Sequence, residues 1–329
     1  MSRFVSPPGC SGRPSACFLL ALGILASLGI CKAIRADDVV NAKQNPKANQ
    51  DDPAWQDVEL VTKDRVQLGM RFFAGNEDKQ TIPIILLHGW TGPDGPGSGR
   101  DLYGLATSLQ AAGHAVAIPD LRGHGQSLRV KDVPHEINRD RFRPADIRDM
   151  MLDVEAVRSF LVAQNNRGKL NLELLCVVGF EMGSVVALNW IQYDLMVPSF
   201  PTLKQGQDVK GFVLVSPEKS FKGFAIGQAM ANEALRRDLS AMIIYGKLGP
   251  LSNEAKRLYN ILRRSRRRAT STDTNDNQDL FLVELDTRLR GSKLLEAPGV
   301  DVSSQIVNFV DRRIASLNET FPWRDRTRP

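Results

Sequence analysis

The sequence is poor in cysteine and histidine, and both shortages limit its chemistry. It has four cysteines and four histidines in 329 residues. Three of the cysteines, Cys10, Cys17 and Cys31, lie in the first 36 residues. Removal of that segment would leave Cys176 alone and exclude an internal disulfide. Because Cys176 lies in an apolar run, it is predicted to be a small core residue.

The sequence also lacks an apolar run long enough to cross a membrane comfortably. Its longest uncharged apolar run, residues 17–31, has 15 residues, whereas a spanning helix needs roughly 20. Arg3 and Arg13 precede this run, and the basic stretch 32–36 follows it, which is typical of a signal peptide over residues 1–36. We therefore expect an exported protein, periplasmic or secreted. The alternative is a retained membrane anchor through residues 17–31.

Sequence motifs for metal and phosphate binding are missing. No cluster of His, Cys and carboxylate residues has metal-ligand spacing, and neither G-x-x-x-x-G-K-[ST] nor a well-placed G-x-G-x-x-G occurs. No metal or cofactor is therefore predicted. The net charge is +6, but four positive charges and no acidic residue lie in the first 36 residues, which leaves about +2 for the remainder.

The rest of the chain alternates short apolar runs with helical patterns, which is typical of an α/β fold with a parallel sheet covered on both faces. A polar linker is predicted over 37–55, a domain over 56–318 and a C-terminal tail over 319–329. An antiparallel pair is predicted at Val58–Val61 and Val66–Phe73. The other predicted strands are Ile82–Leu87, Ala115–Pro119, Leu172–Gly179, Val209–Val215, Met242–Tyr245 and Leu280–Leu285. The predicted helices are Leu102–Ala112, Asp146–Gln164, Gly183–Leu195, Phe224–Arg237, Asn253–Arg267 and Val302–Leu317.

Three turns that follow predicted strands carry a family signal. They read Leu87-His88-Gly89-Trp90, then Asp120-Leu121-Arg122-Gly123-His124-Gly125-Gln126-Ser127, then Gly179-Phe180-Glu181-Met182-Gly183. With serine in place of Glu181, the third is the nucleophile elbow G-x-S-x-G. On these residues the chain resembles the α/β-hydrolase superfamily over residues 58–318. The resemblance implies that fold without a large cap domain, because only a short stretch near 220–238 stands where many members insert a lid.

The resemblance also assigns the positions of the family's catalytic groups. The nucleophile position is Glu181, the acid position is Gly249 and the histidine position is Arg290. All three differ from the family pattern, so the resemblance implies a degenerate triad. The amides of Trp90 and Met182 stand at the oxyanion-hole positions.

Ester hydrolysis by a serine needs a hydroxyl nucleophile, a base and a carboxylate that orients the base. Removing one triad member commonly slows the reaction by about 10⁴–10⁶-fold. The main interpretation is therefore a pseudoenzyme that binds a small molecule or a protein partner. The alternative is an exported hydrolase, of esterase, lipase or epoxide type, with unusual or weak chemistry at Glu181, whose carboxylate could attack an epoxide or an alkyl halide.

A carboxylate nucleophile would still need a base to activate water. Arg290 cannot serve because a guanidinium stays protonated, and His88 and His124 lie in turn motifs where a structural role is expected. Glu218 could replace the missing acid but would have no histidine to orient. We expect Glu181 and Arg290 to form an ion pair, because an unpaired charge in a partly buried cleft is costly.

The densest charge cluster is basic and extends along the predicted helix Asn253–Arg267 to the residue after it. It contains Lys256, Arg257, Arg263, Arg264, Arg266, Arg267 and Arg268. Its simplest interpretation is a solvated helix face. It could also contact an anionic surface, which gives a third class of function, an interaction module. The predicted export disfavours nucleic acid as the partner.

Overall fold

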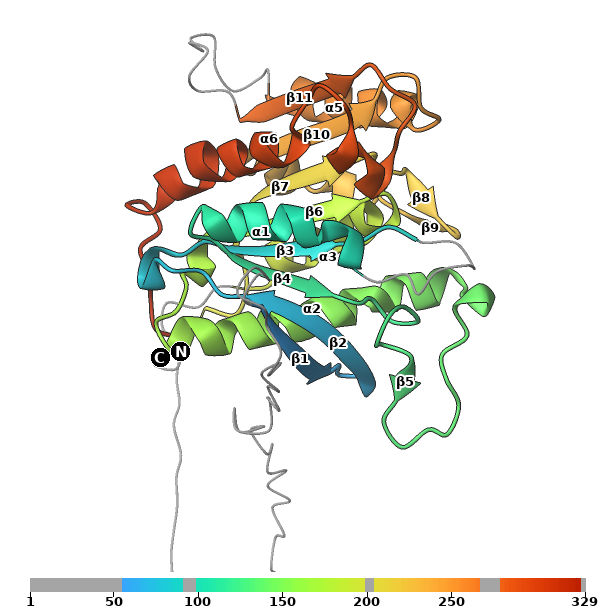
Figure 1. Ribbon diagram of the computed structural model, residues 1–329, viewed down its shortest axis with the longest axis vertical. Helices are drawn as coiled ribbons and strands as arrows, with labels where there is room; N and C mark the ends of the chain where they lie inside the picture. The colour runs from blue at the N-terminus through green and yellow to red at the C-terminus, as the bar shows by residue number, and fades with distance from the viewer. Residues whose placement is uncertain (1–54, 91–98, 199–203, 267–278, 327–329) are drawn as a thin grey trace, which may run out of the picture. The chain divides into compact units, whose positions relative to one another are not determined.

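A mixed sheet organises the described part of the chain, which in this computed structural model comprises residues 55–90, 99–198, 204–266 and 279–326 (Figure 1). The strand order is β1-β2-β4-β3-β6-β7-β10-β11, and β5 pairs with β2. Strand β2 pairs antiparallel with β1, β4 and β5. The other pairs, from β4 across the sheet to β11, are parallel. The bounds are β1 Trp55–Val61, β2 Val66–Phe73, β3 Pro83–Leu87, β4 Ala115–Pro119, β5 Arg129–Val130, β6 Leu175–Phe180, β7 Val209–Val215, β10 Ser240–Gly246 and β11 Leu280–Leu285. A separate hairpin pairs β8 Ser220–Phe221 with β9 Phe224–Ala225.

Helices cover both faces of this sheet. Those on one face are α2 Pro144–Asn166, α3 Met182–Met196, α4 Glu233–Arg237 and α5 Ser252–Arg266, and those on the other are α1 Tyr103–Ala111 and α6 Val302–Phe309 (Figure 1). A π-helical turn, Val310–Ile314, and a 3₁₀ turn, Ala315–Leu317, continue α6. This is the doubly covered sheet that the alternation of apolar runs predicts.

The pleat of β3 shows why its sequence is apolar at every position. Ile85 and Leu87 contribute to the core beneath α2 and α3, whereas Ile84 and Leu86 contribute to the core beneath α1 and α6. All four are fully buried. A strand covered on both faces has no side that faces solvent. Its sequence is therefore apolar throughout instead of alternating between apolar and polar residues.

Most predicted elements are confirmed within one to three residues. The predicted helix Phe224–Arg237 is wrong, because Phe224 begins strand β9 and only Glu233–Arg237 forms an α-helix. Two positive φ angles at Lys222 and Gly223 (43° and 84°) make the tight hairpin turn, and Asn232 begins α4 by accepting a hydrogen bond from the amide of Leu235. Leu172–Leu174 forms a 3₁₀ turn before β6 instead of the start of the strand.

The second turn motif closes around Arg122, which is largely buried. Its guanidinium donates to Asp153 of α2 at 2.7 Å and to Asp64, beside β2, at 2.5 Å. The amide of Arg122 also donates to Asp153 at 2.8 Å. Arg122 therefore joins α2 to the turn after β4 and to the β1–β2 hairpin, and the motif has a structural role.

Replacement of Asp153 by alanine should lower the free energy of unfolding by about 3–5 kcal/mol, because Arg122 would remain buried without its main partner. Urea denaturation measures this change. Asp149→Ala is the matched control, since Asp149 lies on the same helix and pairs with Arg148 at the surface. Its effect should stay within about 0.5 kcal/mol. Equal effects of the two substitutions would contradict this role of the Asp153 pair.

Candidate functional site

The turn after β6 has the geometry of a nucleophile elbow. Strand β6 ends at Phe180, Glu181 has φ 47° and ψ −116°, and α3 begins at Met182. The amide of Glu181 donates to the carbonyl of Val215 at 3.0 Å. A non-glycine residue in this region of backbone space costs about 1–3 kcal/mol and persists where the surroundings impose it. The strand-to-helix turn thus projects the Glu181 side chain from the carboxyl edge of the sheet.

Close approach of the backbone imposes glycine at position 183. A Cβ at Gly183 would lie 2.3 Å from the carbonyl oxygen of Leu87, at the end of β3. Helix α3 can therefore begin directly against β3 only with glycine at this position. The final glycine of the motif Gly179–Gly183 is thus explained by packing, independently of the residue at 181.

The carboxylate of Glu181 lies between the loops that follow β3 and β11. A Cβ at Gly89 would lie 2.7 Å from its Oε2 atom, and a Cβ at Gly291 would lie 2.7 Å from its Cδ atom. Arg290 forms an ion pair with it, with 3.2 Å between Nε and Oε1. The predicted contact between Glu181 and Arg290 is therefore confirmed. The Glu181 side chain keeps 18% of its surface exposed, so the carboxylate is recessed but accessible.

Opposing effects act on the acidity of Glu181. Burial raises the pKa of its carboxyl, and the charges of Arg290 and Lys293 lower it, with a net rise. The two cations therefore oppose the protonation that burial favours. Lys293, which sequence analysis did not single out, lies in the same loop as Arg290.

A second carboxyl group, Glu218, follows the neighbouring strand β7 in a partly buried position. Burial raises the pKa of Glu218 to about 7, and the negative charges of Glu181 and Glu254 add to the effect while Arg290 opposes it. A carboxyl group with such a pKa can both donate and accept a proton near pH 7. The site therefore contains two acidic groups in different environments.

Ser216 positions the loop that carries Arg290. It lies at the end of β7 with φ 50° and is fully buried, and its hydroxyl accepts a hydrogen bond from the amide of Gly291 at 3.0 Å. Sequence analysis did not identify this residue. The only clue in the sequence is a serine directly after a buried strand. This clue is weak because the partner amide lies 75 residues further along the chain.

The remaining family positions lie at the same edge of the sheet. Met182 is the first residue of α3 and is fully buried. A Cβ at Gly249, after β10, would lie 3.4 Å from the carbonyl of Arg288, so this position contacts the loop that leads to Arg290. Trp90 follows Gly89, and the Lys222 ammonium lies 4.3 Å from the centre of its ring.

The two histidines nearest to the turns have structural roles. Nδ1 of His88 contacts the carbonyl of Gly89 at 2.7 Å, and Nε2 accepts the amide of Leu121 at 3.0 Å. Burial lowers the pKa of His88, and burial followed by the charge of His88 lowers the pKa of His124 to about 3. Both imidazoles are therefore neutral at pH 7 and hold turns together.

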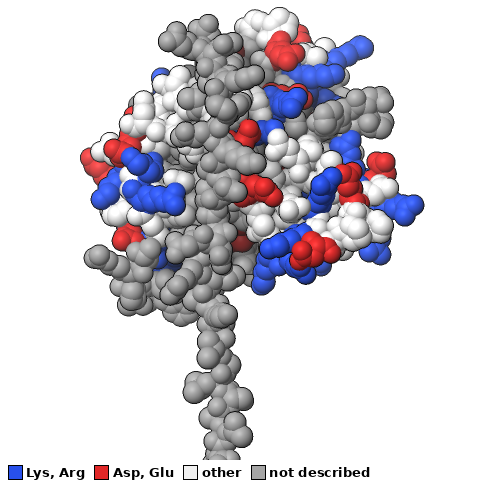
Figure 2. Space-filling model, turned by 60° about the horizontal axis from the view of Figure 1, so that its bottom comes forward, with Lys and Arg blue, Asp and Glu red and all other residues white. Residues whose placement is uncertain are grey.

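The predicted basic surface is only partly available for a ligand. Arg266 donates to the backbone carbonyls of Arg236, Leu239 and Asp279, which close the end of α5. Arg263 and Arg264 lie in the last turn of the same helix, and Arg267 and Arg268 lie outside the described residues. On the face shown in Figure 2, basic and acidic side chains are interspersed.

Within the described ranges, no three His, Cys, Asp or Glu residues are grouped so as to hold a metal ion. None of the helices in these ranges combines the length and the apolar character needed to cross a membrane. The predicted signal peptide, the alternative anchor at 17–31 and most of the predicted linker lie outside those ranges.

Glu181→Gln should lower the pKa of Glu218 from its value of about 7, because it removes the charge that contributes most to that rise. Burial remains, so the pKa should stay above its usual value. A ¹³C NMR titration of the Glu218 carboxyl carbon measures the change. Glu254→Gln, which removes the weaker of the two charges, should shift it less. An unchanged titration in the Glu181 variant would show that the two carboxylates do not interact.

The family model described as the alpha/beta hydrolase family matches residues 84–326. Among solved structures, the esterase Pf2001 of Pyrococcus furiosus has 18% identity and a TM-score of 0.55, and the alignment covers 83% of this chain and 98% of that one. A fungal esterase of Rhizomucor miehei has 14% identity and a TM-score of 0.55, with 80% and 85% covered. A search of curated protein sequences found no match. The family model covers most of the chain, which therefore belongs to the alpha/beta hydrolase family.

Proposed function

We propose that this protein is a hydrolase that works weakly through the carboxylates of Glu181 and Glu218, in place of a serine and a histidine. The observation that carries the proposal is the elbow geometry of Glu181, whose carboxylate is recessed but accessible. Burial and the charge of Glu181 raise the pKa of the Glu218 carboxyl to about 7, which suits an acid–base partner. The similar solved structures are esterases, which fits a hydrolase better than a non-catalytic protein.

The substrate class follows from the nucleophile. Attack by a carboxylate on an ester carbonyl would give a reactive anhydride, whereas attack on a saturated carbon gives a stable ester. We therefore propose epoxides and alkyl halides. In the first step an oxygen of Glu181 bonds to the carbon, and the carbon–halogen or carbon–oxygen bond breaks. An epoxide oxygen takes its proton from neutral Glu218, whereas a halide leaves as the anion and needs none.

The second step hydrolyses the ester on Glu181. Ionised Glu218 takes a proton from water, and the resulting hydroxide attacks the carbonyl carbon of Glu181. The tetrahedral intermediate collapses, and the departing alkoxide takes the proton of the new carboxyl group, which releases an alcohol or a diol and restores the carboxylate of Glu181. After an alkyl halide, Glu218 returns its proton to the solvent. The amides of Trp90 and Met182, which stand at the family's oxyanion-hole positions, would stabilise the negative oxygen.

Arg290 has two opposing effects on this chemistry. Its charge favours ionised Glu181, which the first step requires. Its ion pair also engages Oε1 of that carboxylate at 3.2 Å, so attack must weaken the pair. This opposition is consistent with slow turnover.

The second candidate is a non-catalytic protein that binds a small molecule or a protein partner. The position of the Glu181 carboxylate, held by Arg290 between Gly89 and Gly291, favours it, because that carboxylate occupies space beside the family's oxyanion-hole turn. For either function, we also propose that residues 1–36 direct export of the protein. The alternative is that residues 17–31 are retained as a membrane anchor. Contact between an anionic surface and the exposed arginines of α5 also remains a proposal.

The decisive experiment uses 1-bromobutane and styrene oxide with the purified protein and its Glu218→Gln variant. Because bromide leaves without a proton, the variant should still form the ester from 1-bromobutane but should hydrolyse it slowly. Intact-protein mass spectrometry should then show a butyl adduct, mapped to Glu181 by peptide sequencing. In the unsubstituted protein, bromide release should rise with pH through about 7, as Glu218 ionises.

Glu254→Gln serves as the matched control, since it removes a neighbouring carboxylate that has no role in the two steps. This variant should turn over 1-bromobutane without accumulating an adduct. The Glu181→Gln variant should show neither turnover nor an adduct. Absence of both turnover and adduct in folded unsubstituted protein would reject the carboxylate mechanism and favour the binding role.

A further inference from the structure

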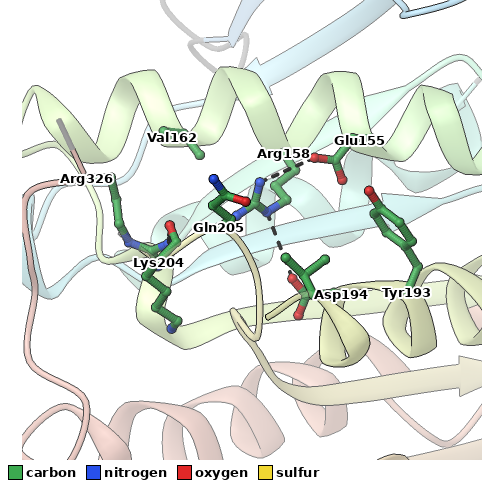
Figure 3. Close-up of a pocket in the computed structure, with 9 residues that line it drawn as sticks. Glu155, Arg158, Val162, Tyr193, Asp194, Lys204, Gln205 and Arg326 are labelled. Carbon is green, nitrogen blue, oxygen red and sulfur yellow. Dashed lines mark hydrogen bonds and ion pairs between the residues drawn. The ribbon is translucent and has the colours of Figure 1, made fainter. Parts of the chain in front are cut away.

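Basic side chains gather in two contrasting settings in the described part of the chain. The first is a cavity of about 360 Å³, whose walls come from α2, the end of α3, the segment before β7 and the C-terminal segment (Figure 3). Asp208, which contacts three of the lining residues, directly precedes β7, whereas Glu181 directly follows the parallel strand β6. The cavity and the proposed catalytic site therefore lie at opposite edges of the sheet.

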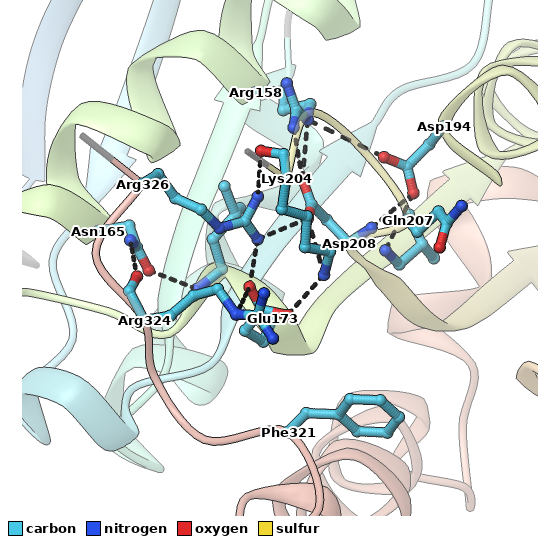
Figure 4. A network of polar contacts seen from close by, with 12 residues as sticks. Arg158, Asn165, Glu173, Asp194, Lys204, Gln207, Asp208, Phe321, Arg324 and Arg326 are labelled. Carbon is cyan, nitrogen blue, oxygen red and sulfur yellow. Dashed lines mark hydrogen bonds and ion pairs between the residues drawn. The ribbon is translucent and has the colours of Figure 1, made fainter. Parts of the chain in front are cut away.

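The cations beside this cavity are engaged within the fold. Arg326 contacts Glu173 at 2.6 Å and Asp208 at 2.7 Å, and Lys204 contacts the same two carboxylates at 2.5 and 3.4 Å. Arg158 contacts Asp208 at 2.7 Å. Figure 4 shows these side chains converging from α2, from the segments before β6 and β7 and from the C-terminal segment. The network also includes Glu155, Asp194, Arg324 and Lys210, whose ammonium donates to the carbonyl of Gln207. Each of its cations thus has a partner inside the protein.

The second setting is the outer face of α5, which lies beside β10 and β11 (Figure 1). The buried residues of this helix, which fix it against the sheet, are Ser252, Ala255, Leu258 and Leu262. Arg257, Ile261 and Arg264 are exposed and follow one another at intervals of four and three residues, so they form one stripe. Arg263, which directly precedes Arg264, is also exposed, and its guanidinium lies 5.9 Å from the ring centre of Tyr259. We call the four exposed residues 257, 261, 263 and 264 the arginine face.

The charges of the arginine face are not neutralised by the protein. Within the described residues, no carboxylate forms an ion pair with any of its three arginines. The carboxylates of α5 itself and of the neighbouring α4 and β11 have other partners. Glu254 accepts the amide of Lys219, Glu233 pairs with Arg237, and Glu284 contacts Lys256 and the hydroxyl of Tyr245, whereas Asp238 and Asp279 act on Arg266 at the end of the helix. The arginine face therefore presents three positive charges and differs from the mixed surface of Figure 2.

The apolar residue in the middle of the arginine face distinguishes between anionic partners. Ile261 keeps 36% of its surface exposed between Arg257 and Arg264. Nucleic acids and acidic polysaccharides offer anionic groups to arginine but no apolar layer for an isoleucine side chain. The interface of an anionic bilayer offers both, because its headgroups carry negative charge and its acyl chains begin directly beneath them. The combination of arginines with an exposed isoleucine therefore favours a lipid surface.

We propose that the arginine face of α5 docks on the surface of an anionic lipid bilayer. The helix lies parallel to the membrane, the guanidinium groups of Arg257, Arg263 and Arg264 contact lipid phosphates, and Ile261 enters the boundary between headgroups and acyl chains. The long aliphatic stems of the arginines add apolar contact while their charged ends remain in water. This proposal names the partner for the anionic contact proposed above, and it does not depend on the carboxylate chemistry of Glu181.

The test is sedimentation of the purified full-length protein with phosphatidylcholine vesicles that contain or lack phosphatidylglycerol. Binding should be tighter to the anionic vesicles and should weaken as salt is added. Arg257→Gln and Arg264→Gln should each weaken it by about fivefold, the contribution of one basic residue at an anionic surface. Arg312→Gln is the matched control, because Arg312 is exposed beside α6 on the other face of the sheet, and it should leave binding unchanged. Residues 1–36 are present in every variant, so their own charges contribute equally to each.

Ile261→Asn separates a lipid surface from a soluble polyanion, because it keeps every charge of the arginine face and removes its apolar residue. It should weaken vesicle binding by about threefold or more with an unchanged melting temperature. Heparin and duplex DNA are the comparison probes. Vesicle binding that Ile261→Asn leaves unchanged, together with tight binding of heparin or DNA, would assign the arginine face to a soluble polyanion and overturn the proposal. Equal effects of Arg257→Gln and Arg312→Gln, or equal binding to neutral and anionic vesicles, would also overturn it. The assay needs no turnover, so its failure is distinct from failure of the carboxylate mechanism.

Discussion

The backbone conformation at residue 181 is the constraint on which the carboxyl edge of the sheet depends. Its positive φ turns the chain from β6 into α3 within a single residue, while Gly183 lets the helix begin against β3. The side chain at 181 must then project among the loops after β3, β7 and β11. A glutamate in that place brings a carboxylate into a recess, where it pairs with Arg290 and adds to the rise in the pKa of Glu218 that burial mainly causes.

The charge of Glu181 affects its two charged neighbours, Arg290 and Glu218, in opposite ways. Arg290 pairs with Glu181 from the loop after β11, and that loop is held in turn by Ser216 at the end of β7. Burial and the charge of Glu181 raise the pKa of Glu218 and so favour its neutral form. Burial of Glu218, together with the charge at the strained position 181, thus separates a paired carboxylate from a carboxyl group whose pKa is raised to about 7, which is the usual basis for dividing acid and base roles between two carboxyl groups.

Local patterns predicted the sheet, most helices and the three turns, because a strand covered on both faces reads as a continuous apolar run. The ion pair of Glu181 with Arg290 was also predictable, because the family's nucleophile and histidine positions, which lie close together, carry these two opposite charges. The interaction of Ser216 with Gly291 was not, because the two lie far apart in sequence and neither carries a motif. The hairpin at Lys222–Gly223 was missed because its apolar residues also fit a helical pattern.

The network at the other edge of the sheet has a consequence for the timing of folding. Glu173 and Asp208 are buried beside central strands, yet Arg326, which neutralises both, follows every strand and helix of the described fold in the sequence. A nascent chain that has synthesised the whole sheet still has two carboxylates without their last partner. Completion of this edge therefore waits until the segment that carries Arg326 has been synthesised.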